Sequence, residues 1–213
     1  RQYAYRTLRE NIISLDLEPG APFNDVEMSQ MIGISRTPVR EAVIQLSEES
    51  RIIEIFPQRG MRIALIGVDL VEEARFLRLV LEKAAVELVC GEADEEDLQW
   101  LDENIRLQEF YLEGGSSRKL LELDNEMHRK LFSICRKELT YEMCQRLAIP
   151  YDRIRSLSVA AVKDHKIIED HKKLLEAIRS RDKKKAAETM DLHLNRWMLN
   201  EQMFRDQYPA YFK

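Results

Sequence analysis

Four side chains in the C-terminal part of the chain have the types and the spacing of a metal-binding site. Asp124 and His128 are four residues apart, so in a helix both project from the same face. His171 and His193 lie on two later segments, each in register with neighbouring apolar residues. One carboxylate and three imidazoles suit a divalent ion such as Zn²⁺, Ni²⁺ or Mn²⁺, and helical bundles build such sites from facing helices. Spacing alone leaves a second interpretation open, in which the histidines are ordinary buried or surface residues.

Two arginines near the N-terminus have the spacing of a DNA-recognition helix. Arg36 and Arg40 are four residues apart in the segment GISRTPVREAV, near the N-terminal end of one helix face. Before them, Gly33 can adopt the positive φ of a sharp turn, Ser35 is a suitable N-cap, and Pro38 fits the first helical turn. A guanidinium group pairs with guanine or with phosphate, and recognition helices contact bases through their N-terminal residues. The segment therefore predicts the turn and second helix of a helix-turn-helix.

The elements around these arginines predict a winged helix-turn-helix over residues 1–65. Apolar spacing indicates three helices in its first fifty residues. Two β-rich runs, RIIEIF and MRIALI, then flank the turn PQRG, which is typical of a hairpin. Gln58, Arg59 and Gly60 lie at the tip of this wing, where a glycine lets the backbone approach a phosphate or a groove closely.

Residues 70–213 are predicted to form a second, all-helical domain after a short linker at residues 66–70. Six segments with helical spacing of apolar residues follow one another, and no strand pattern is found beyond residue 65. Pro150 is expected to interrupt the fourth of these helices. The predicted fold is mainly α: an N-terminal winged helix-turn-helix and a C-terminal antiparallel bundle of about six helices.

Composition places the chain among globular proteins of the cytoplasm. No apolar run approaches the roughly 20 residues of a membrane-spanning helix, and the polar N-terminus does not resemble a signal peptide. Cys90, Cys135 and Cys144 lack CxxC spacing and are expected to be reduced thiols packed in helices. The net charge of −5 means that DNA binding depends on where the arginines lie rather than on the overall charge.

Both parts of the chain resemble one family, the GntR-type transcription regulators of the FadR subfamily. The N-terminal motifs that carry the resemblance are LRENIISLDLEPG, GISRTPVREAV and PQRG. The C-terminal pattern of the family is an Asp with a His four residues later, a His followed closely by LLEAI, and a further His. Asp124, His128, His171 and His193 match it, and the last two are 22 residues apart.

The resemblance implies that these four residues hold a divalent metal, which in turn binds a small organic acid. It also implies that Arg78 faces the effector pocket, where its charge would anchor an anionic group. An ion pair between Arg78 and Glu82, four residues later, is the alternative for this arginine.

Three departures from the family pattern affect both parts of the chain. Met127 stands where the family often has Phe before the His, which is a tolerable change of volume. Residues 49–51 are Glu, Ser and Arg where the family usually has Glu-Gly, so the wing shifts or Arg51 adds a phosphate contact. Val26 replaces a base-contacting Arg of some members, which leaves the operator sequence open.

The sequence thus predicts a homodimeric, metal-dependent, ligand-responsive repressor that binds a pseudo-palindromic operator. Arg36 and Arg40 contact bases or phosphates, Thr37 fixes the helix on the DNA backbone, and the wing tip engages the adjacent groove or phosphates. Binding of a small carboxylate is expected to cause derepression. Two alternatives remain: a metal-dependent hydrolase built on the bundle, and a regulator whose metal is purely structural. The sequence offers no second carboxylate or histidine in an obvious general-base position for the hydrolase.

Overall fold

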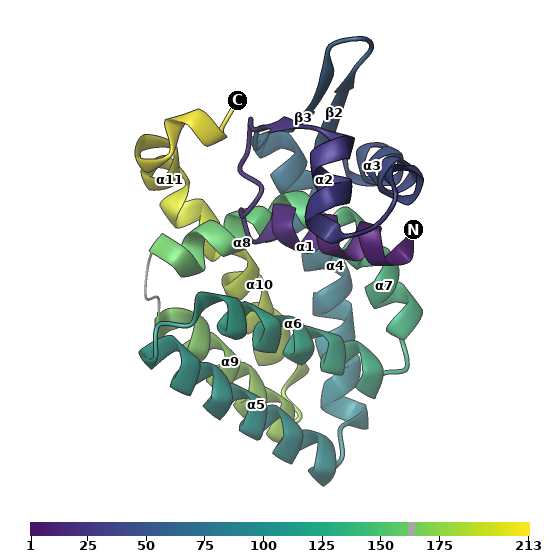
Figure 1. Ribbon diagram of the computed structural model, residues 1–213. Coiled ribbons are helices and arrows are strands. Elements are labelled where there is room, and N and C mark those ends of the chain that lie inside the picture. The colour runs from purple at the N-terminus through teal and green to yellow at the C-terminus, as the bar shows by residue number, and fades with distance from the viewer. Residues whose placement is uncertain (162–164) are drawn as a thin grey trace. The chain divides into compact units, whose positions relative to one another are not determined.

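The computed structural model describes residues 1–161 and 165–213, which form helices and one small sheet (Figure 1). The chain divides into two compact units. The first contains residues 1–74, 146–154 and 202–213, and the second contains residues 75–145 and 155–201. No helix of the described residues is long and apolar enough to cross a membrane. The prediction of a mainly helical protein with a winged helix-turn-helix is confirmed.

Three helices of the first unit form the predicted helix-turn-helix and the helix that supports it. They are α1 (Gln2–Ile13), α2 (Asp25–Ile32) and α3 (Arg36–Ser50). Gly33 ends α2 with φ +74°, as the sharp turn requires. Ser35 takes the N-cap position of α3, but its hydroxyl makes no capping hydrogen bond. The α3 helix packs against α1 and α2, and its buried face consists of apolar side chains at helical spacing: Val39, Ala42, Val43 and Leu46.

The wing is a three-stranded antiparallel sheet in the order β1-β3-β2. The hairpin of β2 (Ile53–Phe56) and β3 (Gly60–Ile63) was predicted, and it projects beside α3 in Figure 1. The strand β1 (Pro22–Phe23) was not predicted, because two residues are too few to show an alternating pattern. It pairs with β3 and so ties the wing to the chain that leads into α2.

The predicted linker is shorter than expected, because α4 (Val68–Glu92) already begins at Val68. Just before it, Ile66 forms a parallel bridge with Phe212 near the C-terminus. This C-terminal segment consists of α11 (Glu201–Gln207) and the 3-10 turn η2 (Pro209–Tyr211). The compact unit that holds the winged helix thus includes C-terminal residues that the sequence analysis assigned to the helical domain. The sequence did not show this, because pairing between two distant segments leaves no periodic pattern in either of them.

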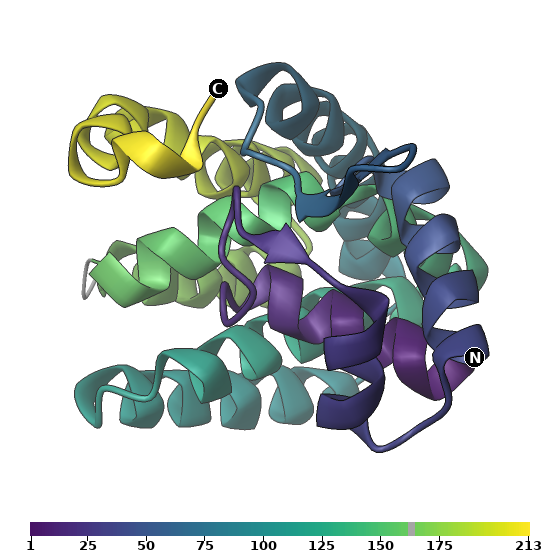
Figure 2. The same ribbon diagram turned by 45° about the horizontal axis from the view of Figure 1, so that its top comes forward.

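The second unit is a helical bundle, in which α5 packs against α6 and α9, and α9 packs against α10. Figures 1 and 2 show α5 and α6 side by side. It contains most of α4, α5 (Glu95–Glu113), α6 (Ser117–Ile134), most of α7 (Glu138–Leu147), the part of α8 (Ile149–Ala161) from residue 155 onward, α9 (His165–Arg179), α10 (Lys183–Asn195) and the 3-10 turn η1 (Arg196–Asn200). Pro150 lies at the second position of α8, where it starts a new helix and separates it from α7, as predicted.

Candidate functional site

The N-terminal end of α3 presents the predicted DNA-contacting side chains to solvent. Arg36, Thr37 and Arg40 are exposed, and the two arginine side chains retain 58% and 67% of their accessible surface. The opposite face of α3 is buried, so the helix is held by its core side while these side chains point outward. The geometry is that of a recognition helix available to a DNA groove.

A carboxylate from α2 contacts both arginines. The side chain of Asp25 is almost fully buried, and its two oxygens lie 3.3 Å from the guanidinium groups of Arg36 and Arg40. One negative charge therefore orients two positive ones, and the three side chains together carry a net charge of +1. The sequence analysis missed this role, because residue spacing gives no information about which side chain of α2 reaches α3.

The wing tip combines exposed side chains with an unusual backbone. Gln58, Arg59 and Gly60 are all exposed, and the loop is closed by a hydrogen bond from Arg59 N–H to the Phe56 carbonyl at 3.0 Å. Gln58 and Gly60 have positive φ values of +62° and +94°. The positive φ of Gly60 lets the hairpin turn tightly enough to present Arg59 at its tip.

Asp124, His128, His171 and His193 converge in the second unit. One potential ligand atom from each residue lies within 4.8 Å of the others. Asp124 and His128 come from α6, His171 from α9 and His193 from α10. The Nε2 atoms of His128 and His193 are 3.2 Å apart, and Nε2 of His171 is 3.4 Å from Oδ1 of Asp124.

Two imidazoles of the cluster have an acceptor close to the other ring nitrogen, and the third has a carboxylate farther away, without a hydrogen bond. Nδ1 of His128 lies 2.5 Å from Oε2 of Glu82 on α4. Nδ1 of His171 lies 2.8 Å from the amide oxygen of Gln108 on α5. Nδ1 of His193 lies 4.0 Å from Asp170 on α9. Metal-binding histidines usually place such an acceptor on the nitrogen that does not face the ion, because it fixes the ring and its tautomer.

Arginines hold the carboxylates around the cluster. Arg78 donates from Nε to Glu82 at 2.6 Å, and both side chains are buried. Arg196 donates to Asp170 at 2.7 Å, and Arg155 pairs with Asp124. The ion pair that the sequence offered as an alternative for Arg78 is therefore present.

Burial and neighbouring charges set the protonation states of His171, His193 and Glu82. Burial, followed by neighbouring positive charges, holds the pKa values of His171 and His193 well below 6.5, so both rings are neutral at pH 7. Burial alone would raise the pKa of Glu82, but the charges and hydrogen bonds of Arg78 and His128 outweigh it and lower this pKa to about 2. Neutral imidazoles and an ionised acid are the forms that bind metal and support it.

These residues fit a divalent metal ion. Within the described part of the chain, Nε2 of His171 is buried and has no hydrogen-bond partner. When their Nδ1 atoms carry the protons, the Nε2 atoms of His128 and His193 direct two lone pairs at each other over 3.2 Å. A separation of about 3 Å is what two ligands of one ion adopt when each lies about 2.1 Å from it. In these tautomers a cation between the two rings would relieve the repulsion between their lone pairs.

Comparison with known proteins finds two matching families, one toward each end of the sequence. Residues 1–63 match the family of bacterial regulatory proteins named gntR, and residues 73–196 match the FCD domain family. The chain belongs to the GntR family, in the FadR-type group that carries an FCD domain. The resemblance inferred from the motifs is thereby confirmed.

Relatives of this GntR protein cover nearly the whole chain. The HTH-type transcriptional repressor RspR of Escherichia coli K12 is 28% identical over 212 residues, covering 99% of this chain and 92% of the relative. The HTH-type transcriptional regulator YdhC of Bacillus subtilis is 26% identical over 195 residues, covering 90% and 86%. The structure of McbR/YncC from E. coli has the same fold, with a TM-score of 0.81, 21% identity and 96% coverage of both chains. This GntR protein is a transcriptional regulator, and its family implies that the winged helix binds DNA.

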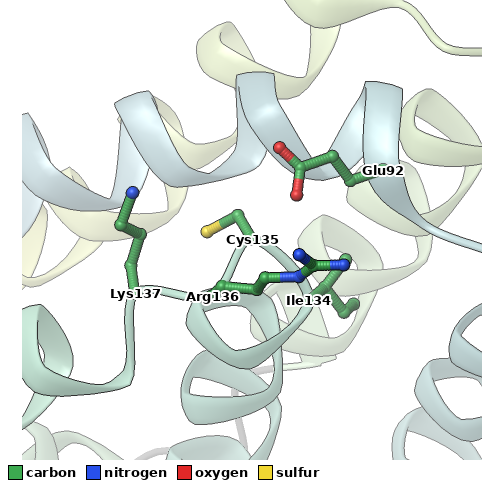
Figure 3. Close-up of a pocket in the computed structure, with 5 residues that line it drawn as sticks. All are labelled: Glu92, Ile134, Cys135, Arg136 and Lys137. Carbon is green, nitrogen blue, oxygen red and sulfur yellow. The ribbon is translucent and has the colours of Figure 1, made fainter.

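A separate surface pocket of the GntR protein lies in the FCD part, with a volume of about 500 Å³. Figure 3 shows Cys135 and Lys137 directed from the turn after α6 toward the helix that carries Glu92, with Arg136 beneath that carboxylate. Burial, with the nearby charge of Glu92, raises the pKa of the Cys135 thiol, and all three cysteines are buried and unbridged. The thiol is therefore protonated and unreactive at pH 7.

The sequence analysis missed the residues that support the cluster. Gln108 and Asp170 carry no motif, and Asp170 is only one residue before His171. Glu82 appeared only as a possible partner of Arg78. His165, which was expected to be an ordinary surface residue, is exposed and lies 3.7 Å from Glu113.

Proposed function

We propose that this protein is a homodimeric repressor whose hold on operator DNA depends on a divalent metal and on a small organic acid bound to it. Asp124, His128, His171 and His193 hold the metal, which would be Zn²⁺, Ni²⁺ or Mn²⁺. The metal supplies positive charge and open coordination positions for a carboxylate. The protein works in the cytoplasm, where its operator is.

The observation that carries the proposal is the convergence of four potential ligands from three helices, with an acceptor close behind two of the imidazoles. A single buried histidine usually has a structural role, but here three rings and a carboxylate share one small volume. Glu82 and Gln108 orient two of the rings so that their Nε2 atoms face inward. A structural role alone gives no reason for so many lone pairs in one buried place.

Operator binding is assigned to the exposed residues of α3 and the wing. Arg36 and Arg40 contact bases or phosphates, Thr37 contacts the backbone, and Gln58, Arg59 and Gly60 engage the adjacent groove. Two heads of a dimer bind two half-sites, which raises affinity through effective concentration. The name of the E. coli relative RspR, a repressor, supports repression as the direction of control.

The effector is a small carboxylate, and Arg78 is assigned to its anionic group. Arg78 is buried in the same unit as the cluster and contacts Glu82, which in turn contacts His128. An effector changes operator affinity only if it favours one arrangement of the heads over another. A coupling free energy of about 1–3 kcal/mol gives a change of roughly 5–150-fold, and we expect the change to be a loss of affinity.

The cluster is assigned to sensing rather than to catalysis. A hydrolase needs a base free to take a proton from water, but Glu82 and Asp170 are held by Arg78 and Arg196. The relatives are named as transcriptional regulators. A sensor returns its carboxylate ligand unchanged, which mass analysis of the ligand after incubation checks directly.

Native mass spectrometry tests the proposal on protein purified without chelator or metal-affinity resin. We expect a dimer with one metal per subunit and a small acid retained on part of it. His171→Gln should abolish metal retention, whereas His165→Gln, at an exposed histidine of the same helix, should not. A wild-type dimer that also refuses added Zn²⁺, Ni²⁺ and Mn²⁺ would overturn the metal assignment and leave the DNA-binding assignment standing.

A further inference from the structure

We propose that Glu82 is a positioning residue that fixes the tautomer of His128, and that Arg78 holds Glu82 in place for this task. The inference rests on the proposed metal-binding function, in which His128 is a ligand. It assigns a role to a residue of α4, a helix that contributes none of the four proposed ligands.

The contacts form a chain of three buried side chains on two helices. Oε1 of Glu82 accepts from Nε of Arg78 at 2.6 Å, and Oε2 lies 2.5 Å from Nδ1 of His128. The exposed fractions of the three side chains are only 1%, 2% and 0% for Arg78, Glu82 and His128. Water therefore does not substitute for either partner of Glu82.

These contacts determine which nitrogen of His128 carries its proton. The buried guanidinium of Arg78 lies 2.6 Å from Glu82 and requires a negative partner, and an ionised carboxylate only accepts hydrogen bonds, so the nitrogen of His128 that faces it must donate. An unprotonated Nδ1 would place two lone pairs 2.5 Å apart in a buried site, which is strongly unfavourable. Nδ1 is thus protonated, and Nε2 keeps the lone pair that faces His193 and a metal ion.

The restraint from Glu82 is more direct than the restraint on the neighbouring ring. Nδ1 of His171 faces the amide oxygen of Gln108, and that amide is oriented in turn by a hydrogen bond from its Nε2 to Asn104 at 2.7 Å. A carboxylate has an acceptor at both oxygens and needs no such orienting partner. Glu82 therefore commits its imidazole to one tautomer through a single side chain.

Arg78 makes this arrangement depend on the proposed effector anchor. Its Nε occupies one oxygen of Glu82 and leaves the other directed at His128. Removing the Arg78 charge therefore loosens Glu82 and also removes the anchor for the anion. We expect metal affinity and anion affinity to fall together when Arg78 is replaced.

The test compares Glu82→Gln with wild type by two measurements. The first is ¹⁵N NMR of the histidine side chains in metal-free protein, where wild-type His128 should be protonated at Nδ1 and the variant should show a mixture of tautomers. The second is Zn²⁺ affinity by competition with a chromophoric chelator, where the variant should bind about 10–100-fold more weakly. Glu87→Gln, at an exposed residue of the same helix, is the matched control and should equal wild type in both.

The outcomes separate this inference from the proposed function. A wild-type His128 protonated at Nε2, or a Glu82→Gln protein with Zn²⁺ affinity within twofold of wild type, overturns the role of Glu82. Failure of wild type to bind any of the three metals overturns the proposed function instead, while the NMR result still decides the tautomer. If Glu82→Gln does not fold, Arg78→Met combined with Glu82→Gln removes both charges and should show the same two changes. Glu82→Asp keeps the charge and should recover part of the affinity.

Discussion

Replacing Arg40 with alanine should weaken operator binding strongly while leaving the fold intact. The Arg40 side chain is 67% exposed and packs against no core, so its removal does not open a cavity. Its contact with Asp25 at 3.3 Å is an ion pair with one exposed partner and contributes little to stability. After the substitution, Arg36 still pairs with Asp25, so the buried carboxylate keeps a partner.

The size of the effect follows from the number of contacts that are lost. A bidentate arginine–base contact contributes about 1–3 kcal/mol, so a dimer that loses one in each head loses about 2–6 kcal/mol. Since about 1.4 kcal/mol corresponds to tenfold, operator affinity should fall between roughly 30-fold and 10⁴-fold. If Arg40 contacts phosphate instead, the slope of log affinity against log salt should also become less steep by about two.

Fluorescence anisotropy with operator and with unrelated DNA, at several salt concentrations, measures both quantities. Arg106→Ala is the matched control, because it removes the same charge from an exposed residue of α5 in the other unit. Operator affinity within twofold of wild type for Arg40→Ala would refute the assignment of α3 as the recognition helix. An equal loss on operator and unrelated DNA would refute base contact and leave phosphate contact.

Three further predictions concern the stability of the first unit. Arg51 ends α3 with φ +55°, which costs a non-glycine residue about 1 kcal/mol, so Arg51→Gly should raise the free energy of unfolding by about 0.5–1 kcal/mol. Urea titration measures this, and an unchanged midpoint would contradict it. The Tyr5 hydroxyl donates to Glu49 at 2.7 Å, and burial together with this bond raises the pKa of Tyr5 from 10.0 to about 12. A raised pKa means that the folded state favours the protonated hydroxyl, so this contribution is complete below pH 10 and is lost as the pH rises to 12. Because the group is only half-buried, Tyr5→Phe should lower the free energy of unfolding by only about 1 kcal/mol at pH 8, and a difference of the same size at pH 11 would argue against this cause. Phe212 is 8% exposed and bridges to Ile66, so Phe212→Ala should lower the free energy of unfolding by about 2–3 kcal/mol and speed amide exchange of Ile66, which hydrogen-exchange NMR measures.

The winged helix illustrates what local sequence decides. Gly33 supplies the left-handed turn, and the apolar residues of α3 recur with helical spacing, so both the turn and the buried face follow from short-range pattern. The exposed position of Arg36 and Arg40 follows as well, because a helix with one buried face presents its other face outward. The same logic gave the hairpin of β2 and β3 but missed β1, which is only two residues long.

The cluster in the FCD part shows a feature that the spacing of residues within single helices does not predict. The i, i+4 spacing of Asp124 and His128 places both on one face of α6, and this is a property of any helix. Whether His171 and His193 reach that face depends on how α9 and α10 pack, which no spacing within one helix specifies. The family resemblance anticipated the convergence, and the residues alone left two interpretations open.

The supporting side chains depended entirely on tertiary structure. The helices and the apolar side of each helix were determined by the sequence alone, because helical periodicity is local. Packing decided that Glu82 meets His128, that Gln108 meets His171, and that Asp25 meets the recognition arginines, because these pairs lie on different helices. The sequence reveals only the type of a polar residue and its position on its own helix. Its partner on another helix depends on how the two helices pack in three dimensions.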